Sequence, residues 1–399
     1  MARLLFLGSF AYLLVGFAQL VIGTVMEPMV HDYGVHYGDG GQMVMNQFLG
    51  GMTGVLCTPW LIKVLGRKGL LLTALALIAI IQTVYFLQPP WAVMLTVAPI
   101  TGFGFGITEA TVGSIVIVAA GENANKAMSG IEVFFGAGAL LMPFIGSLLI
   151  ATGQWKASFI VVAVIAVAAF LSWLLFWPKI LDKSSGTDAE TAVHQKTSGS
   201  AGRGARLTLA VCILFFAVYV GFEMSFIHYL PSMMVANNGL SDSTASLSIS
   251  VFWLAMTIGR MVAGHAADRF GGAAYLVAMC GFNAVFFLLM TGLDGVVSTF
   301  ALTVLAGLAM SGMFSIALVF ANRAVPGVTE RTTSLLMAAG GIGGALLPKL
   351  TGWFLDRFHE DQTRWLFAAF GIVLLLVMLW AVASASKSRR KEIVVSSNM

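Results

Sequence analysis

The stretch "GRMVAGHAADRFGG" (Gly259–Gly272) joins two long apolar runs and has a counterpart in the first half of the chain. The counterpart is "GVLCTPWLIKVLGRKG" (Gly54–Gly69), whose glycines at positions 54 and 66 stand 205 residues before glycines 259 and 271. In both cases the flanking runs are long enough to cross a membrane as helices. The pair of stretches therefore predicts a chain built from two related halves.

The same offset holds at other helix positions. The triplet "VGF" at Val15–Phe17 recurs at Val220–Phe222, and Gly102 corresponds to Gly307. A third group of small and proline residues also recurs at this spacing: Gly136, Gly138 and Pro143 correspond to Gly341, Gly343 and Pro348. One offset kept along the chain predicts an internal repeat in which both copies have the same orientation.

Composition predicts an all-α membrane protein. Of the 399 residues 58% are hydrophobic and 10% are charged, whereas about a quarter of the residues of a soluble domain are charged. Twelve apolar runs are long enough to span ~30 Å of hydrocarbon as helices, which gives six helices in each half. These runs are residues 4–30, 42–62, 69–88, 92–119, 126–152, 156–178, 207–236, 243–265, 273–292, 297–321, 332–354 and 365–386.

The predicted domains follow from these runs. The six-helix halves occupy residues 1–178 and 207–386, and a polar segment rich in Gly, Ser and Thr, residues 179–206, is predicted to be a flexible linker. Residues 387–399 form a tail. Lys and Arg gather on the side of the linker and both termini, so the positive-inside rule predicts cytoplasmic termini in a cell (inner) membrane. The net charge of +4 then reflects topology and requires no nucleic-acid partner.

The cysteines give no sign of a disulfide or a metal site. Cys57, Cys212 and Cys280 stand singly in apolar runs, without a second cysteine at a ligand spacing. No cofactor, metal or catalytic residue is therefore expected.

Glu109 is the only charged residue between Ala92 and Ala119. A carboxylate at the middle of a bilayer costs about 2.5–3.5 kcal/mol on insertion scales. Its spacing from three glycines places all four residues on one helix face: Gly102, Gly106, Glu109 and Gly113. Glu109 is a candidate proton site, and the alternative is a protonated carboxyl that only caps a packing contact.

Three further glutamates lie in the apolar runs. Glu132 is a second candidate for proton coupling, with a structural tie to a loop arginine as the alternative. Glu223 follows Tyr219 by one helical turn, and both are candidate substrate ligands. Glu27 stands directly before Pro28, near the outer end of the first run, where water could reach it.

Other polar and aromatic residues within the runs complete the candidate substrate site. Gln19, Gln47 and Asn283 offer amides for hydrogen bonds. Trp253 could stack on the apolar face of a sugar ring, although most tryptophans in membrane proteins serve packing or the interface.

The later of the two opening stretches resembles the G-x-x-x-D-R-x-G loop signature of the major facilitator superfamily, with Asp268 and Arg269 in place. The earlier copy keeps Arg67 but has Ile62 and Lys63 where an acidic and a basic residue are usual. The resemblance implies a major facilitator fold of twelve transmembrane helices in two six-helix parallel repeats, with substrate bound between the halves and access alternating between the two sides. It also implies gating by Arg67, Asp268 and Arg269, for which simple positive-inside anchoring is the alternative.

Five segments resemble the bacterial glucose/mannose–proton symporters of the fucose–galactose–glucose group. They are "TEATVGSIVI" (Thr108–Ile117), "IEVFFGAGAL" (Ile131–Leu140), "GFEMSFIHYLPSMM" (Gly221–Met234), "SVFWLAMTIGRMVAG" (Ser250–Gly264) and "LAGLAMSGMFSIAL" (Leu305–Leu318). In that family the glutamate equivalent to Glu109 is implicated in proton coupling. Fucose-type members carry an Asn-Asp pair in helix 1 where this chain has Ile22, Gly23 and Thr24, which argues against fucose.

The predicted function is proton-coupled symport of a hexose such as glucose or mannose by a monomer that is not an enzyme. Its partners are the sugar, protons and the lipid bilayer. A proton-driven exporter of drugs or metabolites is the alternative, although the glycine-proline pair typical of exporters is absent because four residues separate Gly138 from Pro143. A receptor or scaffold is disfavoured because it would have no use for buried glutamates.

Overall fold

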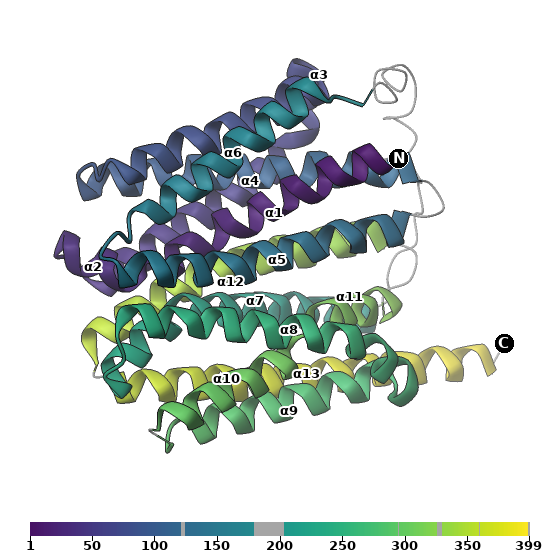
Figure 1. The fold of residues 1–399 in the computed structure, drawn as a ribbon. Helices are drawn as coiled ribbons and strands as arrows, with labels where there is room; N and C mark the ends of the chain where they lie inside the picture. The colour runs from purple at the N-terminus through teal and green to yellow at the C-terminus, as the bar shows by residue number, and fades with distance from the viewer. Residues whose placement is uncertain (121–123, 179–202, 294, 325–328, 359, 398–399) are drawn as a thin grey trace. The chain divides into compact units, whose positions relative to one another are not determined.

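The computed structural model describes residues 1–399 except 121–123, 179–202, 294, 325–328, 359 and 398–399 (Figure 1). The described residues are helical, with short connections and no strand. The helices are α1 (Ala2–Thr24), α2 (Met26–Tyr33), α3 (Tyr37–Phe86), α4 (Trp91–Ala120), α5 (Ala124–Ala151), α6 (Ala157–Leu175), α7 (Arg203–Asn238), α8 (Asp242–Phe270), α9 (Gly272–Met290), α10 (Val296–Met310), α11 (Met313–Ala324), α12 (Thr329–Arg357) and α13 (Glu360–Ser397).

Eleven helical segments of the described chain are long and apolar enough to cross a membrane. One of them, α3, is 50 residues long and contains two of the predicted spans, because it bends at Gly66, where φ is 67° and ψ is 162°. This left-handed backbone favours glycine, which has no Cβ to clash. Helices α10 and α11 together make one segment, Val296–Ala324. The eleven segments thus accommodate the twelve predicted crossings.

The first predicted run, residues 4–30, is divided in the structure. Helix α1 ends at Thr24, Val25 leaves the helical backbone, and the short helix α2 begins at Met26. Pro28 lies in the first turn of α2, where a missing N–H costs nothing, and Gly34 ends the helix with φ 61°. The sequence placed Glu27 near the end of the first spanning helix, but in the structure it lies on a separate helix after it.

The chain forms two compact units that are described separately. Unit 1 contains residues 1–195 and 228–250, and unit 2 contains residues 196–227 and 251–399. Residues 179–202 of the predicted linker lie outside the described residues, and α7 begins at Arg203. The predicted tail is helical as far as Ser397, because α13 continues through it.

In unit 1, α3 packs along α4 and α1 packs along α5 (Figure 1). The contact between α3 and α4 uses the glycines that precede Glu109. A methyl group at Gly102 would lie 2.8 Å from the main-chain nitrogen of Gly51 and would overlap the carbonyl oxygen of Gln47. This glycine face is therefore where two helix backbones meet.

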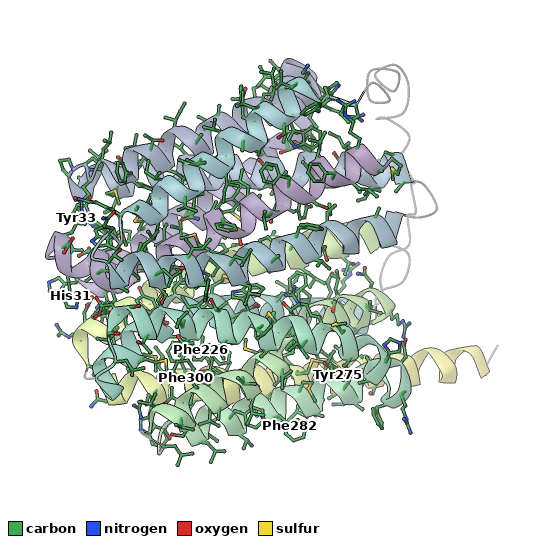
Figure 2. The ribbon with its side chains drawn as sticks, viewed as in Figure 1. His31, Tyr33, Phe226, Tyr275, Phe282 and Phe300 are labelled. Atoms are coloured by element: carbon green, nitrogen blue, oxygen red, sulfur yellow. The ribbon has the colours of Figure 1, made fainter. Side chains whose placement is uncertain are left out.

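In unit 2, α9 packs along α13, and phenylalanines from three helices form the core between them and α7. The Phe287 ring lies 4.7 Å from that of Phe222 and 4.8 Å from that of Phe226. Phe226, which Figure 2 labels, also lies 5.6 Å from Phe367. These tilted and edge-on pairs are the arrangements that aromatic rings prefer. All four rings are almost completely buried.

The internal repeat reappears in the backbone of the two units. Gly271, between α8 and α9, has φ 89° and is equivalent to Gly66, at the bend of α3, at the offset of 205 residues. A methyl group at Gly54 would lie 3.1 Å from the Cα of Phe103, and one at Gly259 would lie 3.2 Å from the carbonyl oxygen of Leu308. Positions 103 and 308 are again 205 residues apart, so equivalent glycines admit equivalent helices.

Candidate functional site

Unit 1 brings the two predicted coupling residues together with a tyrosine. Glu109 lies on α4, Glu132 on α5 and Tyr12 on α1, and we call these three residues the acidic cluster. The hydroxyl of Tyr12 lies 3.3 Å from the main-chain carbonyl oxygen of Glu109, to which it donates. The carboxylates of Glu109 and Glu132 are close enough to act electrostatically on each other and on the Tyr12 hydroxyl.

A glycine on α1 allows this convergence. A methyl group at Gly8, one turn before Tyr12, would lie 3.3 Å from Val112 of α4 and 3.5 Å from Ile131 of α5. Since α1 meets both helices at this point, Tyr12 reaches the level of the two glutamates. The carboxylates differ in exposure: Glu109 is partly exposed, and Glu132 is exposed.

Unit 2 holds a second polar group around Glu223 on α7. The Glu223 side chain is 6% exposed and hydrogen-bonds the hydroxyl of Tyr219, one turn earlier. That hydroxyl also lies 3.1 Å from the carbonyl oxygen of Met310. A phenol has one proton to donate, so the Glu223 carboxylate and the Met310 carbonyl oxygen share it. The carboxylate can therefore accept a hydrogen bond from one more donor.

Arg260 of α8 supplies the positive charge for Glu223. Its guanidinium acts electrostatically on both Glu223 and Tyr219 and lies 5.7 Å from the centre of the Trp253 ring. Its Nη2 also lies 3.5 Å from the sulfur of Met256. The Arg260 side chain is exposed whereas Trp253 is buried, so the cation covers the ring from an open side. We call Tyr219, Glu223, Trp253 and Arg260 the Glu223 cluster.

Asn283 of α9 lies beside the Glu223 cluster. One turn earlier, Cys280 is close enough to Tyr219 to interact with it electrostatically, and one turn later Phe287 packs on Phe222. Asn283 therefore faces the same stretch of α7. It is fully buried, and neither amide atom has a hydrogen-bond partner within the part of the chain that the structure describes. An amide in this state can accept one ligand group and donate to another.

The two predicted glutamine ligands have different surroundings. Gln47 is 2% exposed, and its amide nitrogen donates to the carbonyl oxygen of Ala18 at 3.1 Å, which ties α3 to α1. Gln19 follows Ala18 directly and is partly exposed on α1. Gln47 thus already uses one amide proton for packing, and the substrate role of both glutamines stays a prediction.

The three predicted gating residues lie at a helix bend or a helix end. Arg67 directly follows the bend of α3 and is partly exposed, whereas Asp268 and Arg269 are exposed near the last turn of α8. The gating role of all three stays a prediction.

Sequence reasoning missed Arg260 and Tyr12. Arg260 is the one charged residue of the apolar run 243–265 and stands seven residues after Trp253, two turns along the same face. Tyr12 stands seven residues before Gln19, in the same relation. A search for polar residues two turns apart within a span would have found both.

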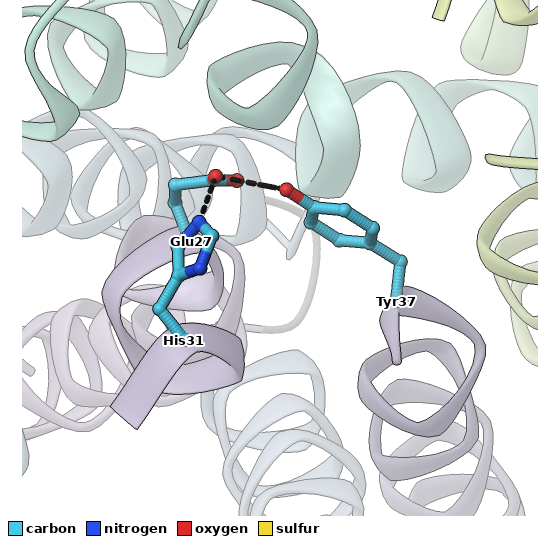
Figure 3. Close-up of polar contacts among 3 residues, drawn as sticks. All are labelled: Glu27, His31 and Tyr37. Carbon is cyan, nitrogen blue, oxygen red and sulfur yellow. Dashed lines mark hydrogen bonds and ion pairs between the residues drawn. The ribbon is translucent and has the colours of Figure 1, made fainter. Parts of the chain in front are cut away.

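The expectation that Glu27 reaches water is wrong. Its side chain is 3% exposed and is held by Tyr37 and His31 (Figure 3).

Among the described residues no group of three or more His, Cys, Asp and Glu side chains could hold a metal ion.

A family model described as Major Facilitator Superfamily matches residues 8–235 and, a second time, residues 211–396. Among curated proteins, the glucose/mannose transporter GlcP of Bacillus subtilis (strain 168) is 28% identical over 366 residues, which cover 90% of each chain. The putative transporter AraJ of Escherichia coli (strain K12) is 24% identical over 315 residues, 78% of this chain and 75% of that one.

Solved structures give the same fold. The nucleoside transporter NupG superposes with a TM-score of 0.76 at 15% identity over 96% of this chain and 98% of that one. A D-xylose–proton symporter superposes with a TM-score of 0.72 at 15% identity over 94% and 96%. At these identities the likeness concerns the fold alone.

Proposed function

Because this chain belongs to the Major Facilitator Superfamily, a family of membrane transporters and not of enzymes, we propose that it is a symporter that carries a hexose together with a proton. The hexose is of the glucose or mannose type, and the binding site alternates between access from outside and from inside. The transporter works as a monomer in the cell (inner) membrane, with both termini in the cytoplasm.

The observation that carries the proposal is the Glu223 cluster in a chain that resembles a glucose/mannose transporter over 90% of its length. A hexose is an uncharged polyol, and its hydroxyl groups need both acceptors and donors. Glu223 offers carboxylate oxygens, and Arg260 offers guanidinium N–H groups on the open side of the same cluster. The carboxylate and the cation balance each other, which suits a neutral substrate.

Two neighbours add shape and direction to this site. The Trp253 ring, whose centre lies 5.7 Å from the Arg260 guanidinium, provides an apolar face of the kind that packs against sugar C–H groups. Asn283 has an amide with no partner among the described residues, so it can both donate to and accept from one sugar hydroxyl. Tyr219 holds the Glu223 carboxylate in place.

We assign proton coupling to the acidic cluster of unit 1. Glu109 and Glu132 carry like charges within interaction range of each other, and one proton shared between them removes their repulsion. A proton taken up on Glu109 from outside and released inside would couple the sugar to the proton gradient. The hydrogen bond from Tyr12 to the main chain of Glu109 keeps α1 in register with α4.

The moving parts of the cycle are the halves of the sequence, residues 1–178 and 207–386, joined by the linker at 179–206. We assign the inner gate to Arg67, Asp268 and Arg269, because they stand at the bend of α3 and at the end of α8 on the proposed cytoplasmic side. Charges at such positions bias a two-state element when their partners change between its states.

Transport in vesicles tests the proposal. Right-side-out vesicles with an inward proton gradient should accumulate labelled glucose or mannose, and an uncoupler should abolish the accumulation. In inverted vesicles the native outer face lines the lumen. When protons are more concentrated in that lumen, as they are outside the native membrane, these vesicles should not accumulate the sugar. Extrusion of a drug driven by the gradient, without hexose transport, would replace the symporter with the exporter.

A further inference from the structure

Glu27 is a buried carboxylate on a short helix outside the spans, and both of its oxygens are occupied. The Tyr37 hydroxyl lies 2.8 Å from Oε1 and 3.0 Å from Oε2, and the His31 Nε2 lies 2.8 Å from Oε1 (Figure 3). Glu27 is 3% exposed, whereas the side chain of His31 is 66% exposed. A carboxylate this well bonded fixes the tyrosine that it faces.

Tyr37 is bonded through its main chain as well. It is the first residue of α3, and its carbonyl oxygen accepts a hydrogen bond of 2.9 Å from the hydroxyl of Tyr229 on α7. The Tyr229 side chain is fully buried. Glu27 therefore fixes the side chain of Tyr37, and the main chain of Tyr37 accepts the hydrogen bond from Tyr229 of α7.

Three serines of α8 make further bonds of the same kind within unit 1. Each hydroxyl donates to a main-chain carbonyl oxygen of α1 or α5: Ser243 to Ser147 at 2.8 Å, Ser246 to Thr24 at 3.2 Å and Ser250 to Leu140 at 2.9 Å. With the Tyr229 bond they form what we call the outer seal, because under the proposed topology these residues lie in the outer halves of their helices. Segment 228–250 accordingly groups with residues 1–195, although the sequence repeat assigns it to the second half.

Charge links the same two regions. Asp242, the first residue of α8, is close enough to Glu27 to repel it and close enough to His31 to attract it. His31 thus stands between two carboxylates, one from α2 and one from α8. Asp32 does not compete for this position, because it accepts a hydrogen bond of 2.7 Å from the indole nitrogen of Trp155.

We propose that Glu27 is a positioning residue that acts through Tyr37 to set how firmly the outer seal is closed. Transport through the proposed site requires the outer ends of α7 and α8 to leave α1, α3 and α5 once in each cycle, so this inference rests on the proposed function. Removal of the Glu27–Tyr37 bond frees the first turn of α3, weakens the Tyr229 bond and shifts the protein toward the state that is open to the outside.

Labelling of a buried reporter tests the proposal without any need for transport. The reporter is Ser246→Cys, at a position that is fully buried in the outer seal, in a chain whose three native cysteines are replaced by alanine. In right-side-out vesicles, Tyr37→Phe should raise the rate of labelling by an impermeant thiol reagent by about tenfold, the effect of a lost hydrogen bond to a charged group. An unchanged rate overturns the proposal.

Tyr33→Phe is the matched control. Tyr33 lies on the same helix as Glu27, but its hydroxyl donates to the carbonyl oxygen of Pro89 at 2.9 Å and, among the described side chains, makes no bond to Glu27 or to segment 228–250. Its labelling rate should equal that of the reporter chain. A rise as large as that of Tyr37→Phe would mean general loosening of the outer ends and would overturn the proposal.

A second pair of variants separates positioning from folding. Glu27→Gln keeps the size of the side chain and one acceptor oxygen, and should raise labelling by less than Glu27→Ala does. Both should leave the hexose dissociation constant in detergent within about twofold of wild type, since neither touches the Glu223 cluster. Equal labelling of Glu27→Ala and wild type overturns the proposal, whereas failure of hexose transport in the wild type overturns the proposed function and leaves the labelling result valid.

Discussion

Gln47 on α3 and Phe252 on α8 occupy equivalent positions in the two halves. The main-chain carbonyl oxygen of each packs closely against a glycine of a neighbouring helix. The partner glycines, Gly102 and Gly307, are also equivalent. The side chains do different things: Gln47 bonds the main chain of Ala18, and Phe252 packs on Phe226 at 5.6 Å. The repeat thus preserves the approach of the backbones and leaves the side chains free to differ.

The carboxylates follow the same rule. Glu109 is equivalent to Phe314, which packs on Phe216 at 5.2 Å, and Glu223 is equivalent to Ala18, whose carbonyl oxygen accepts the Gln47 bond. Neither half carries a glutamate where the other does. This asymmetry is the structural basis for the proposed division of labour, with the proton handled by unit 1 and the sugar by unit 2.

The largest expected effect breaks the shared backbone. Gly102→Val and Gly307→Val should each lower the free energy of unfolding by about 3 kcal/mol, because their Cβ atoms would overlap the carbonyl oxygens of residues 47 and 252. Thermal unfolding in detergent measures the loss. Gly281→Ala is the control, since a methyl group there meets nothing within 4 Å. Destabilisation by only one of the two valine variants would show that the backbones are not equivalent.

Removal of the Glu223 carboxylate in unit 2 should have the next largest effect. Glu223→Ala should weaken hexose binding by about 1.5–3 kcal/mol, the range for hydrogen bonds that involve a charged group. Isothermal titration with glucose and mannose gives the change in dissociation constant. Glu109→Gln, in the other half, should leave that constant nearly unchanged. Wild-type affinity in Glu223→Ala would remove Glu223 from the sugar site.

Neutralisation of Glu109 in unit 1 should affect accumulation alone. One proton moved down 100 mV releases about 2.3 kcal/mol, enough for roughly 50-fold accumulation of sugar. Glu109→Gln mimics the protonated form and should abolish this accumulation while sugar–sugar exchange in vesicles continues. A variant that still concentrates sugar would transfer the coupling role to Glu132, and one that no longer binds sugar would show that Glu109 contacts the substrate.

The fold was largely predictable from the sequence because its signals are long and repeated. Twelve apolar runs and one offset are properties of the whole chain, so single errors hardly matter. The end of α1 was not predictable in this way, because a break at Val25 depends on local geometry within a continuous apolar run.

The candidate site was predictable residue by residue but not as a set of contacts. A carboxylate in an apolar run is conspicuous, which is why Glu109 and Glu223 were found. Their partners Tyr12 and Arg260 were not found. A tyrosine is common in apolar helices, and Arg260 fits the positive-inside rule equally well. Which residues meet depends on helix rotation and packing, and a single sequence does not determine these.

The smallest expected effect is a gain in stability, and it compares two buried amides. Gln82 on α3 is fully buried, and within the described residues neither of its amide atoms has a hydrogen-bond partner, as is also true of Asn283. The position equivalent to Gln82 is Phe287, which lies in the aromatic core of unit 2. Gln82→Leu should therefore raise the free energy of unfolding by about 1 kcal/mol, since it removes a desolvated amide.

Asn283→Leu should give a similar gain for the same reason, measured by thermal unfolding. The two variants should differ in function, because only Asn283 is assigned to the sugar: Gln82→Leu should keep wild-type hexose affinity, and Asn283→Leu should lose it. If Asn283→Leu binds hexose normally, its amide is an unpaired core group like Gln82, and the sugar site of unit 2 is confined to the Glu223 cluster. If Gln82→Leu also loses binding, unit 1 takes part in sugar recognition and the proposed division between the halves fails.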